Sequence, residues 1–330
     1  MRAVWYESNG AAADVLEVGE LPAPEPGRGE VRVRLVTSGI NPIDIKRRRG
    51  TRGQTVEERT VPHFDGAGVI DAVGEGVAQG RMGERVWVYE GQWQRSMGTA
   101  AEQIVLPEGH AVPLPVNTTF AEGACLGIPA LTAHRAVFGD GPVEGRTVLV
   151  TGGAGAVGAY AIQFAKLGGA RVLTTVSTDE KAEIAADAGA DYVFHYKAEN
   201  VVQRISDLPG GGGVDRIVEV EFGGNLEQSL KVLKPNGVIA AYASDALLEP
   251  KLPFYALAYK SATARFVLVF MMPEEAKQKA VADISGWLEG HHLRHYVARR
   301  FPLEEAAAAH EAVERGPIGN VVLELGEAPV

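Results

Sequence analysis

A glycine-rich turn constrains the fold of this chain more than any other feature of its sequence. The segment "TVLVTGGAGAVGAYAIQFAK", residues 147–166, begins with a β-rich run and ends as an apolar helix, with G-x-G-x-x-G spacing between them. In that context the first glycine makes the tight turn, the second lets the main chain approach a pyrophosphate, and the third allows close packing of the helix. The start of the helix offers unpaired N–H groups and the positive end of its dipole to phosphates. We therefore predict a dinucleotide site that involves Gly153, Gly155, Ala156, Val157 and Gly158.

The region after this turn alternates between two periodicities. Strand-like runs are separated by helical segments near 179–188, 199–207 and 225–233, and the runs occupy 147–152, 170–176, 191–196, 214–221 and 237–244. Strands that alternate with helices of this length are typical of a doubly wound parallel sheet.

The two ends of the chain have a different pattern. Residues 1–120 contain short strand-like runs separated by Pro and Gly, which is typical of an all-β domain. The tail adds a helical segment and the strand "NVVLELG". Because an isolated pair of strands is unstable, the tail strands are expected to complete the N-terminal domain. We therefore predict an α/β protein with a β-rich domain at 1–122 and 272–330 and a nucleotide-binding domain at 123–271.

Composition narrows the class of protein. A length of 330 residues suits two domains, and a net charge of −10 argues against a nucleic-acid partner. No apolar run approaches the roughly 18 residues that span a bilayer, and the N-terminus lacks a signal-peptide pattern, so a cytoplasmic protein without a membrane partner is expected. The basic run at 46–49 is a local exception, interpreted as a solvated face or as a contact for a phosphate.

Residues after the second alternating strand bear on which dinucleotide binds. NAD-binding chains place Asp or Glu about 20 residues after the glycine turn, where it binds ribose hydroxyls. Here the strand is followed by Ser177 and Thr178, with Lys181 one turn later. Hydroxyls with a nearby cation suit a 2′-phosphate, so NADP(H) is the predicted cofactor, with Tyr196 beside the adenosine. The competing interpretation makes Asp179 a ribose ligand, although Asp179 is also suited to the first turn of a helix.

Several motifs spread along the chain carry a family resemblance. They are "MRAVWYESNG", "SGINPIDIKRRRG", "DGAGVIDAVGEGV", "GIPALTAHRAV", "GGAGAVG" and "GPIGNVVLEL". Together they resemble the zinc-free quinone oxidoreductases, the zeta-crystallin-like branch of the medium-chain dehydrogenase/reductase superfamily. The resemblance implies a GroES-like β-rich catalytic domain built from both chain ends and a Rossmann domain between them.

The same resemblance bears on metal binding. Zinc-dependent members of the superfamily hold the metal with Cys, a His in a G-H-E motif, and a further Cys or Asp. The corresponding positions here are Asn41, Phe64 and Ile128, which are poor zinc ligands, and the single cysteine, Cys125, rules out a thiolate cluster. One histidine, His63, is expected to be a loop residue with a hydrogen-bonded or solvated ring. The sequence therefore predicts chemistry without a metal.

The resemblance also implies site residues. Asn41 and Asp44 are expected to line the nicotinamide and substrate cleft, where Phe64 and Lys46 are further candidates. Each has a plainer alternative: Asn41 as a turn residue, Asp44 as a helix cap, Phe64 as core and Lys46 as a solvated side chain in place of the family's Tyr. The resemblance also implies that Thr132, Ser244 and Phe270 contact the cofactor outside the 2′-phosphate. Asn320 is a further implied contact, at a position where family members often have Lys.

Without a metal Lewis acid, an acceptor must already be electrophilic. The function predicted is hydride transfer from NADPH to a quinone. A reductase of 2-alkenals or enoyl compounds is an alternative, because it uses the same residues. A protein that binds NADPH without turnover, or that binds RNA through the basic run, is a further alternative.

The apolar run "TARFVLVFMM", residues 263–272, predicts the state of assembly. It follows the last alternating strand, and an exposed edge strand this apolar would aggregate in a monomer. In the family the corresponding strand pairs with its two-fold mate, so a C2 homodimer that buries Phe266 and Leu268 is expected. The alternative is that the chain's own C-terminal helix covers the run.

Overall fold

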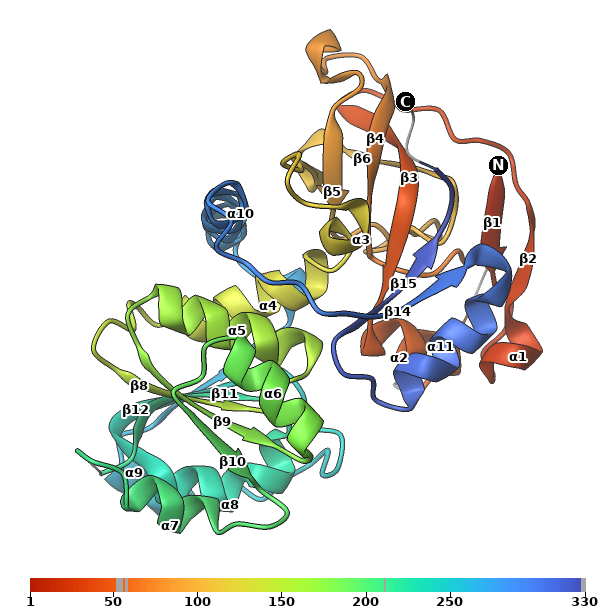
Figure 1. Cartoon of the computed structure of the whole chain (residues 1–330). Coiled ribbons are helices and arrows are strands. Elements are labelled where there is room, and N and C mark those ends of the chain that lie inside the picture. The colour runs from red at the N-terminus through yellow and green to blue at the C-terminus, as the bar shows by residue number, and fades with distance from the viewer. Residues whose placement is uncertain (52–55, 57–58, 211, 328–330) are drawn as a thin grey trace. The chain divides into compact units, whose positions relative to one another are not determined.

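The computed structural model of the chain describes residues 1–51, 56, 59–210 and 212–327 (Figure 1). It divides into unit 1, residues 1–128 and 281–330, and unit 2, residues 129–280. The sequence placed these divisions at 122 and 271. They lie further along the chain, within the helices α4 (Gly127–Phe138) and α10 (Glu274–Glu289).

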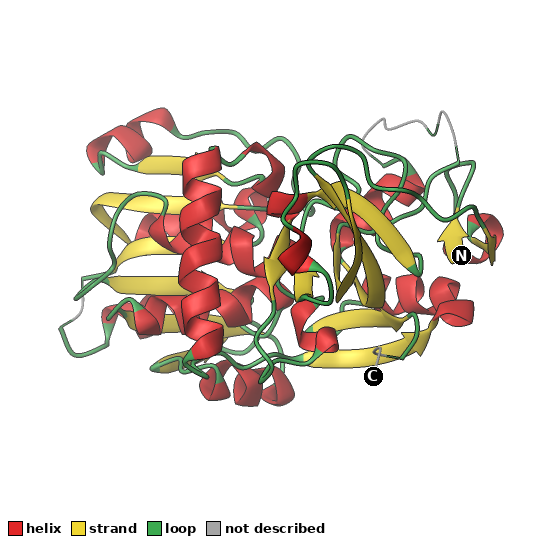
Figure 2. Cartoon of the chain, turned by 90° about the horizontal axis from the view of Figure 1, so that it is seen from above, coloured by secondary structure: helices red, strands yellow, loops and turns green. Residues whose placement is uncertain are grey.

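Unit 2 is built on a six-stranded sheet in which each described pair of neighbours is parallel (Figure 2). The strand order β10-β9-β8-β11-β12-β13 is that of a doubly wound dinucleotide-binding fold. The alternating pattern predicted the first five of these strands in chain order. Their bounds are β8 (Thr147–Thr151), β9 (Arg171–Val176), β10 (Tyr192–His195), β11 (Val214–Glu219), β12 (Leu233–Ala241) and β13 (Thr263–Phe266).

Helices connect these strands, and side chains at their starts explain where several begin. Thr178 accepts a bond from the main chain of α6 (Asp179–Asp187), and Asn200 does the same for α7 (Val201–Ser206). Glu221 caps α8 (Phe222–Val232) by accepting from Gly224 N at 3.3 Å. Caps of this kind satisfy N–H groups that have no partner within a helix. Unit 2 also contains α5 (Ala156–Leu167), α9 (Phe254–Tyr259) and most of α4.

The apolar run at 263–272 is only partly a strand. β13 ends at Phe266, and a 3₁₀ turn follows at Val269–Met271. The expectation of an edge strand over the whole run 263–272 is therefore wrong. The side chains explain the turn, because Val267, Val269 and Phe270 are buried whereas Phe266, Leu268 and Met271 are exposed. Period-two alternation cannot bury three side chains of this spacing on one face.

Unit 1 contains a second sheet in the order β14-β15-β3-β4-β5-β7, with β6 paired to β3. The tail strands pair with β3 through β15, which confirms that the C-terminus completes the N-terminal domain. The bounds are β3 (Glu30–Ile40), β4 (Asp65–Val73), β5 (Arg85–Val88), β6 (Gln103–Pro107), β7 (Ala111–Pro113), β14 (Val297–Pro302) and β15 (Asn320–Glu324), with a separate pair β1 (Arg2–Trp5) and β2 (Glu17–Glu20). Its helices are α1 (Ala12–Val15), α2 (Pro42–Arg49), α3 (Phe120–Gly123) and α11 (Ala306–Glu314).

The basic run at the end of α2 is not a solvated face. Arg48 is fully buried, its Nη1 donates to Gly10 O at 2.6 Å, and its Nη2 pairs with Glu314 on α11. Arg49 Nη2 donates to the other oxygen of Glu314 at 2.6 Å. The Arg47 guanidinium lies 5.3 Å from the centre of the Phe64 ring. The run therefore stabilises α2 within unit 1, and the interpretation as a free basic face is wrong.

Replacing Glu314 with Gln is expected to lower the stability of unit 1 by about 3 kcal/mol, because the buried Arg48 charge would lose its anionic partner. Urea unfolding followed by tryptophan fluorescence measures this, since the four tryptophans of the chain all lie in unit 1, at Trp5, Trp87, Trp93 and Trp287. Glu311→Gln is the matched control on the same helix; its exposed pair with Arg315 is worth about 0.5 kcal/mol at most. Equal unfolding midpoints for the two variants would contradict the stabilising role of the ion pair between Arg48 and Glu314.

Candidate functional site

The turn between β8 and α5 uses its glycines in different ways. Gly152 has φ +69°, in the left-handed region that favours glycine, so Gly152 makes the reversal. Gly153 is a central residue of the same turn, which Gly155 N closes by donating to Gly152 O at 3.0 Å, although Gly153 lacks a positive φ. Gly153 is required for another reason: a Cβ there would lie 2.0 Å from Thr174 Oγ1 on β9.

The start of α5 is shaped to receive a negatively charged group. Gly155 precedes the helix and is exposed, and a Cβ on it would meet only Gly152 O, at 3.3 Å. A Cβ on Gly158 would lie 2.3 Å from the same oxygen, which confirms that the third glycine allows the helix to pack closely. The half-buried Ala156 and Val157 form the first turn, where N–H groups lack helical partners. These features fit a dinucleotide pyrophosphate.

A cavity of about 280 Å³ lies beside this turn at the carboxyl edge of the sheet. In doubly wound folds ligands bind outside the carboxyl ends of the strands, where the strand order reverses. The lining mixes apolar side chains with hydroxyls and amides and comprises Leu149, Thr151, Gly152, Thr175, Tyr196, Val201, Val202, Val220, Glu221, Asn225, Gln228, Ser229 and Val232.

A buried carboxylate organises this edge. Glu219 is fully buried at the end of β11, and burial raises its pKa. Its oxygens accept from Thr151 Oγ1, Glu221 N and Asn225 Nδ2, each at 2.8 Å, and from Ser229 Oγ at 3.2 Å. These bonds tie the end of β8 to the start of α8. Sequence reasoning missed Glu219, because a lone Glu in an apolar run gives no sign of donors that arrive from three elements.

The residues predicted to contact a 2′-phosphate emerge at neighbouring strand ends. Ser177 and Thr178 follow β9, and Tyr196 follows β10, with its N–H donating to Val176 O at 3.2 Å. Lys181 is half-buried on the first turn of α6, and Tyr196 is 52% exposed. Parallel pairing of β9 and β10 therefore brings these side chains to one edge.

Thr178 and Asp179 at this edge make contacts within the protein that bear on the predicted cofactor contacts. Thr178 is already the cap of α6, its Oγ1 accepting from Lys181 N at 3.4 Å. Asp179 is the first residue of α6, as expected for a first-turn charge, and its side chain is fully exposed. Its carboxylate lies 3.7 Å from His195 Nδ1, a neighbour that the sequence did not indicate.

The other predicted cofactor residues lie in different environments. Ser244 Oγ donates to Leu247 O at 2.6 Å and accepts from Gly223 N at 2.9 Å, so it supports the start of α8. Thr132 is buried on α4, and Phe270 is buried in the 3₁₀ turn after β13. The burial of Phe270 suits a core side chain. Asn320 begins β15 in unit 1, where it is buried and its Nδ2 donates to Tyr296 O at 3.4 Å.

Unit 1 gathers the predicted residues of α2 around a second buried carboxylate. Asp44 Oδ2 accepts from Asn41 N at 2.7 Å, so Asp44 caps α2 as its plainer alternative predicted. Asp44 is buried, burial raises its pKa well above the ordinary value, and its Oδ1 has no hydrogen-bond partner in the described part of the chain. Asn41 Nδ2 donates to Asp65 Oδ2 at 2.8 Å.

Asp65 accepts hydrogen bonds from Asn41 and Ile128, two of the three residues that the resemblance aligns with zinc ligands. Its Oδ1 and Oδ2 lie 3.0 and 2.9 Å from Ile128 N, and Oδ2 also accepts from Asn41. The third position, Phe64, is fully buried beneath Arg47. Within residues 1–51, 56, 59–210 and 212–327, no group of three or more His, Cys, Asp and Glu side chains is placed to hold a metal ion.

A chain of buried hydrogen bonds extends from Asp65 to α11. Thr99 Oγ1 donates to Asp65 O at 2.6 Å and lies 2.8 Å from Ser38 Oγ. His63 Nδ1 lies 2.9 Å from Ser38 Oγ, and His63 Nε2 lies 2.8 Å from His310 Nε2. The prediction that His63 is a loop residue with a hydrogen-bonded ring is confirmed.

The main-chain oxygen of Asp65, at one end of this series of hydrogen bonds, fixes the direction of the others. Asp65 O can only accept, so Thr99 donates to it and Ser38 in turn donates to Thr99. His63 then carries its proton on Nδ1 and accepts at Nε2 from His310. Burial lowers the pKa of His63 to about 3 and that of His310 well below its ordinary value, so both rings are neutral. His310 Nδ1, which has no hydrogen-bond partner, is then a bare nitrogen rather than an unpaired N–H.

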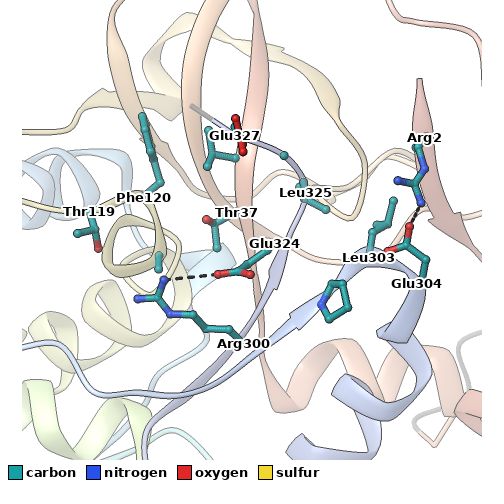
Figure 3. A pocket seen from close by; sticks show the side chains of 14 residues that line it. Arg2, Thr37, Thr119, Phe120, Arg300, Leu303, Glu304, Glu324, Leu325 and Glu327 are labelled. Carbon is teal, nitrogen blue, oxygen red and sulfur yellow. Dashed lines mark hydrogen bonds and ion pairs between the residues drawn. The ribbon is translucent and has the colours of Figure 1, made fainter. Parts of the chain in front are cut away.

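Lys46 and a surface groove of unit 1 lie apart from the hydrogen bonds described above. Lys46 is half-buried in the last turn of α2. The groove, of about 570 Å³, lies elsewhere in unit 1 and is flanked by the ion pairs Arg300–Glu324 and Arg2–Glu304 (Figure 3). Its exposed, already paired charges give it no chemistry related to a nicotinamide.

Comparisons with known proteins match both units. Residues 27–116 match the alcohol dehydrogenase GroES-like domain, and residues 156–285 match the zinc-binding dehydrogenase family. The chain is 31% identical to quinone oxidoreductase of Homo sapiens over 98% of each chain. It is 29% identical to 2-haloacrylate reductase of a Burkholderia species, also over 98% of each.

Solved structures agree over the whole chain. Quinone oxidoreductase of Escherichia coli in complex with NADPH superposes with a TM-score of 0.86 at 25% identity, covering 98% of this chain and 100% of the other. A structure described as an NAD-dependent alcohol dehydrogenase superposes with a TM-score of 0.89 at 32% identity, covering 99% and 100%. The names of these neighbours thus differ in cofactor and in substrate.

Proposed function

Because the chain belongs to the quinone oxidoreductases of the medium-chain dehydrogenase/reductase superfamily, we propose that it transfers hydride from NADPH to a quinone-type acceptor without a metal. The observation that carries the proposal is the open N-terminus of α5, where Gly155 leaves room for phosphate at the carboxyl edge of the sheet. The full-length similarity to quinone oxidoreductases supports the acceptor class.

Residues of unit 2 would hold the cofactor, which when bound supplies a hydride. The glycine turn and the first N–H groups of α5 would bind the pyrophosphate. Ser177, Lys181 and Tyr196 would bind the 2′-phosphate and cover the adenosine. Ser244 would act by supporting the start of α8 near the nicotinamide side, and Glu219 would hold β8 against α8. Thr132, Phe270 and Asn320 remain predictions from the resemblance.

Metal independence is proposed from the donor chemistry in unit 1. Of the positions aligned with zinc ligands, Asn41 and Ile128 present N–H groups to the Asp65 carboxylate, and Phe64 is buried core. N–H groups bind anions rather than cations, so this set does not fit zinc. The acceptor must then be electrophilic before it binds, as quinones and α,β-unsaturated carbonyls are.

Stopped-flow oxidation of NADPH tests the function, with quinones in one series and 2-alkenals, enoyl thioesters and 2-haloacrylate in another. We expect quinones to be reduced with the higher kcat/KM, and we expect the rate to survive prolonged dialysis against a chelator. The second series tests the alternative that the 2-haloacrylate reductase relative favours. No oxidation of NADPH by either series would refute the proposal, and activity restored only by Zn²⁺ would refute its metal-free form.

Lys181 tests the choice of cofactor. Replacing Lys181 with Ala should weaken NADPH binding by about 1–3 kcal/mol, because a charged partner of the 2′-phosphate is lost. Binding of NADH, which lacks that phosphate, should barely change and serves as the control. Fluorescence titration of the two cofactors measures both. Equal affinity of the unmodified protein for NADPH and NADH would contradict the choice.

A C2 homodimer is part of the proposal. β13 pairs with β12 and is the last strand in the order of its sheet, and Phe266 and Leu268 on this segment are 68% and 50% exposed. Nearby, α9 exposes Phe254, Tyr255 and Tyr259 by 71%, 73% and 87%. Because exposed apolar edges favour pairing, a second copy of this strand is the proposed partner. The exposure argues against cover by the chain's own C-terminal helix.

Light scattering at micromolar concentration should give about 70 kDa, twice the chain mass of 35.0 kDa. Phe266→Asp should shift the particle toward 35.0 kDa by placing a charge in the interface. Val116→Asp, at an apolar residue of unit 1 that is 89% exposed, should leave the mass unchanged. An unmodified protein that scatters as one chain would refute the dimer.

A further inference from the structure

The Asp65 carboxylate of unit 1 is held by hydrogen-bond donors from two helix starts. It is fully buried and accepts from Ile128 N at 2.9 and 3.0 Å and from Asn41 Nδ2 at 2.8 Å. Ile128 is the second residue of α4, so the carboxylate also lies at the positive end of that helix. Asp65 therefore connects the starts of α2 and α4.

The surroundings hold this carboxylate in one position. A Cβ on Gly127 would lie 2.1 Å from Asp65 Oδ1, so only glycine allows the approach of α4. On the main-chain side, Asp65 O accepts from Thr99 Oγ1 at 2.6 Å, at the end of the directed chain of hydrogen bonds through Ser38. Both the carboxylate and its main chain are thus immobilised.

The bond to Asp65 determines which way the Asn41 amide faces. An ionised carboxylate only accepts, so the amide nitrogen of Asn41 must point toward it; the reverse orientation would bring two acceptors together. The side-chain oxygen of Asn41 faces the first turn of α2, where Asn41 and Asp44 form a capping box. The amide nitrogen carries a second N–H, for which the described part of the chain supplies no hydrogen-bond partner.

We infer that Asp65 is a positioning residue that orients the Asn41 amide, so that its second N–H donates to the acceptor's oxygen as negative charge develops there. The inference rests on the proposed function. A fixed N–H donor at that oxygen stabilises the charge better than a mobile one, because it needs no reorganisation during hydride transfer. Asp65 acts through Asn41 and does not itself touch the acceptor.

A double-mutant cycle with quinone as acceptor tests the inference. Asp65→Asn keeps the shape but removes the charge and replaces one oxygen with an NH2 donor, which would meet Ile128 N at the Oδ1 position or both Ile128 N and Asn41 Nδ2 at the Oδ2 position. It should lower kcat roughly tenfold to a hundredfold and leave KM for NADPH within about threefold. Asn41→Ala should cost as much, and the double variant should be no slower than Asn41→Ala alone. Costs that multiply would show that the two residues act independently, and that result would overturn the inference.

Asp71→Asn is the matched control on the same strand. Asp71 is a half-buried carboxylate on β4 that accepts from Arg32 Nε at 2.8 Å and Gln103 Nε2 at 3.0 Å. Its substitution should leave kcat unchanged. A loss of kcat equal to that of Asp65→Asn would show that the strand, and not the contact with Asn41, is what matters.

The pH profile separates positioning from packing. Burial raises the pKa of Asp65 to about 7, while the bonds from Ile128 and Asn41 oppose the rise. The ionised form, which holds both donors, prevails above that pH, so kcat should increase as pH rises through about 7 and Asp65→Asn should abolish this step. Asp44, Glu90 and Cys125 also face Asp65; burial keeps the thiol neutral by raising its pKa. A variant profile identical to that of the wild type would overturn the inference.

A readout without turnover keeps the inference separate from the proposed function. In side-chain amide NMR, assigned by loss of the signal in Asn41→Ala, one Asn41 amide proton should exchange slowly with solvent and the other faster, and Asp65→Asn should remove the difference. Equal exchange in the wild type would overturn the orientation. Absence of quinone turnover in a protein with the expected exchange would instead refute the proposed function.

Discussion

The parallel direction of the strands in unit 2 is the constraint on which its site depends. Parallel strands end at the same edge, so residues far apart in sequence are delivered together without any direct attraction between them. Gly152 after β8, Ser177 after β9, Tyr196 after β10 and Glu219 at the end of β11 all reach this edge. Loops at such an edge supply main-chain donors and polar side chains, while the sheet below supplies rigidity. This division explains why a short cavity lined by Thr151 and Asn225 borders the glycine turn.

Local features were predictable because their causes are local. Gly155 and Gly158 have the spacing that a helix start at a phosphate site demands, and Thr178 precedes α6 as a capping residue should. Gly152 escaped prediction because the letters G-G-x-G do not show which glycine has positive φ. Arg48 escaped because its partner, Glu314, is 266 residues away. Contacts of that separation depend on how β15 and α11 return to β3, which periodicity does not encode.

Unit 1 treats its buried charges in two contrasting ways. Arg48 is compensated by a single opposite charge on α11, so either partner alone would be costly. Asp65 instead has no cation against its carboxylate among the described ion pairs; neutral N–H donors and the start of α4 satisfy it. A carboxylate held only by dipoles retains a raised pKa, whereas pairing with Arg would have lowered it. Asp65 therefore changes its protonation state near neutral pH, whereas the ion pair of Arg48 with Glu314 does not.

The same arrangement explains why this site is the reverse of a metal site, with N–H donors around an anion in place of lone pairs around a cation. A zinc ion requires lone pairs that converge on one point, and the surrounding protein must supply negative charge. At the aligned positions of this chain the convergent groups are the Asn41 amide and the Ile128 N–H, and the point on which they converge is an anion, Asp65. Substituting one of the three positions would not create a cation site, because the other N–H donors already hold the Asp65 carboxylate and the adjacent buried Asp44 already accepts from Asn41 N. On the inference drawn above, the second N–H of the Asn41 amide would be the donor offered to the acceptor, and a single hydrogen-bond donor would suit an acceptor whose carbonyl is already electrophilic.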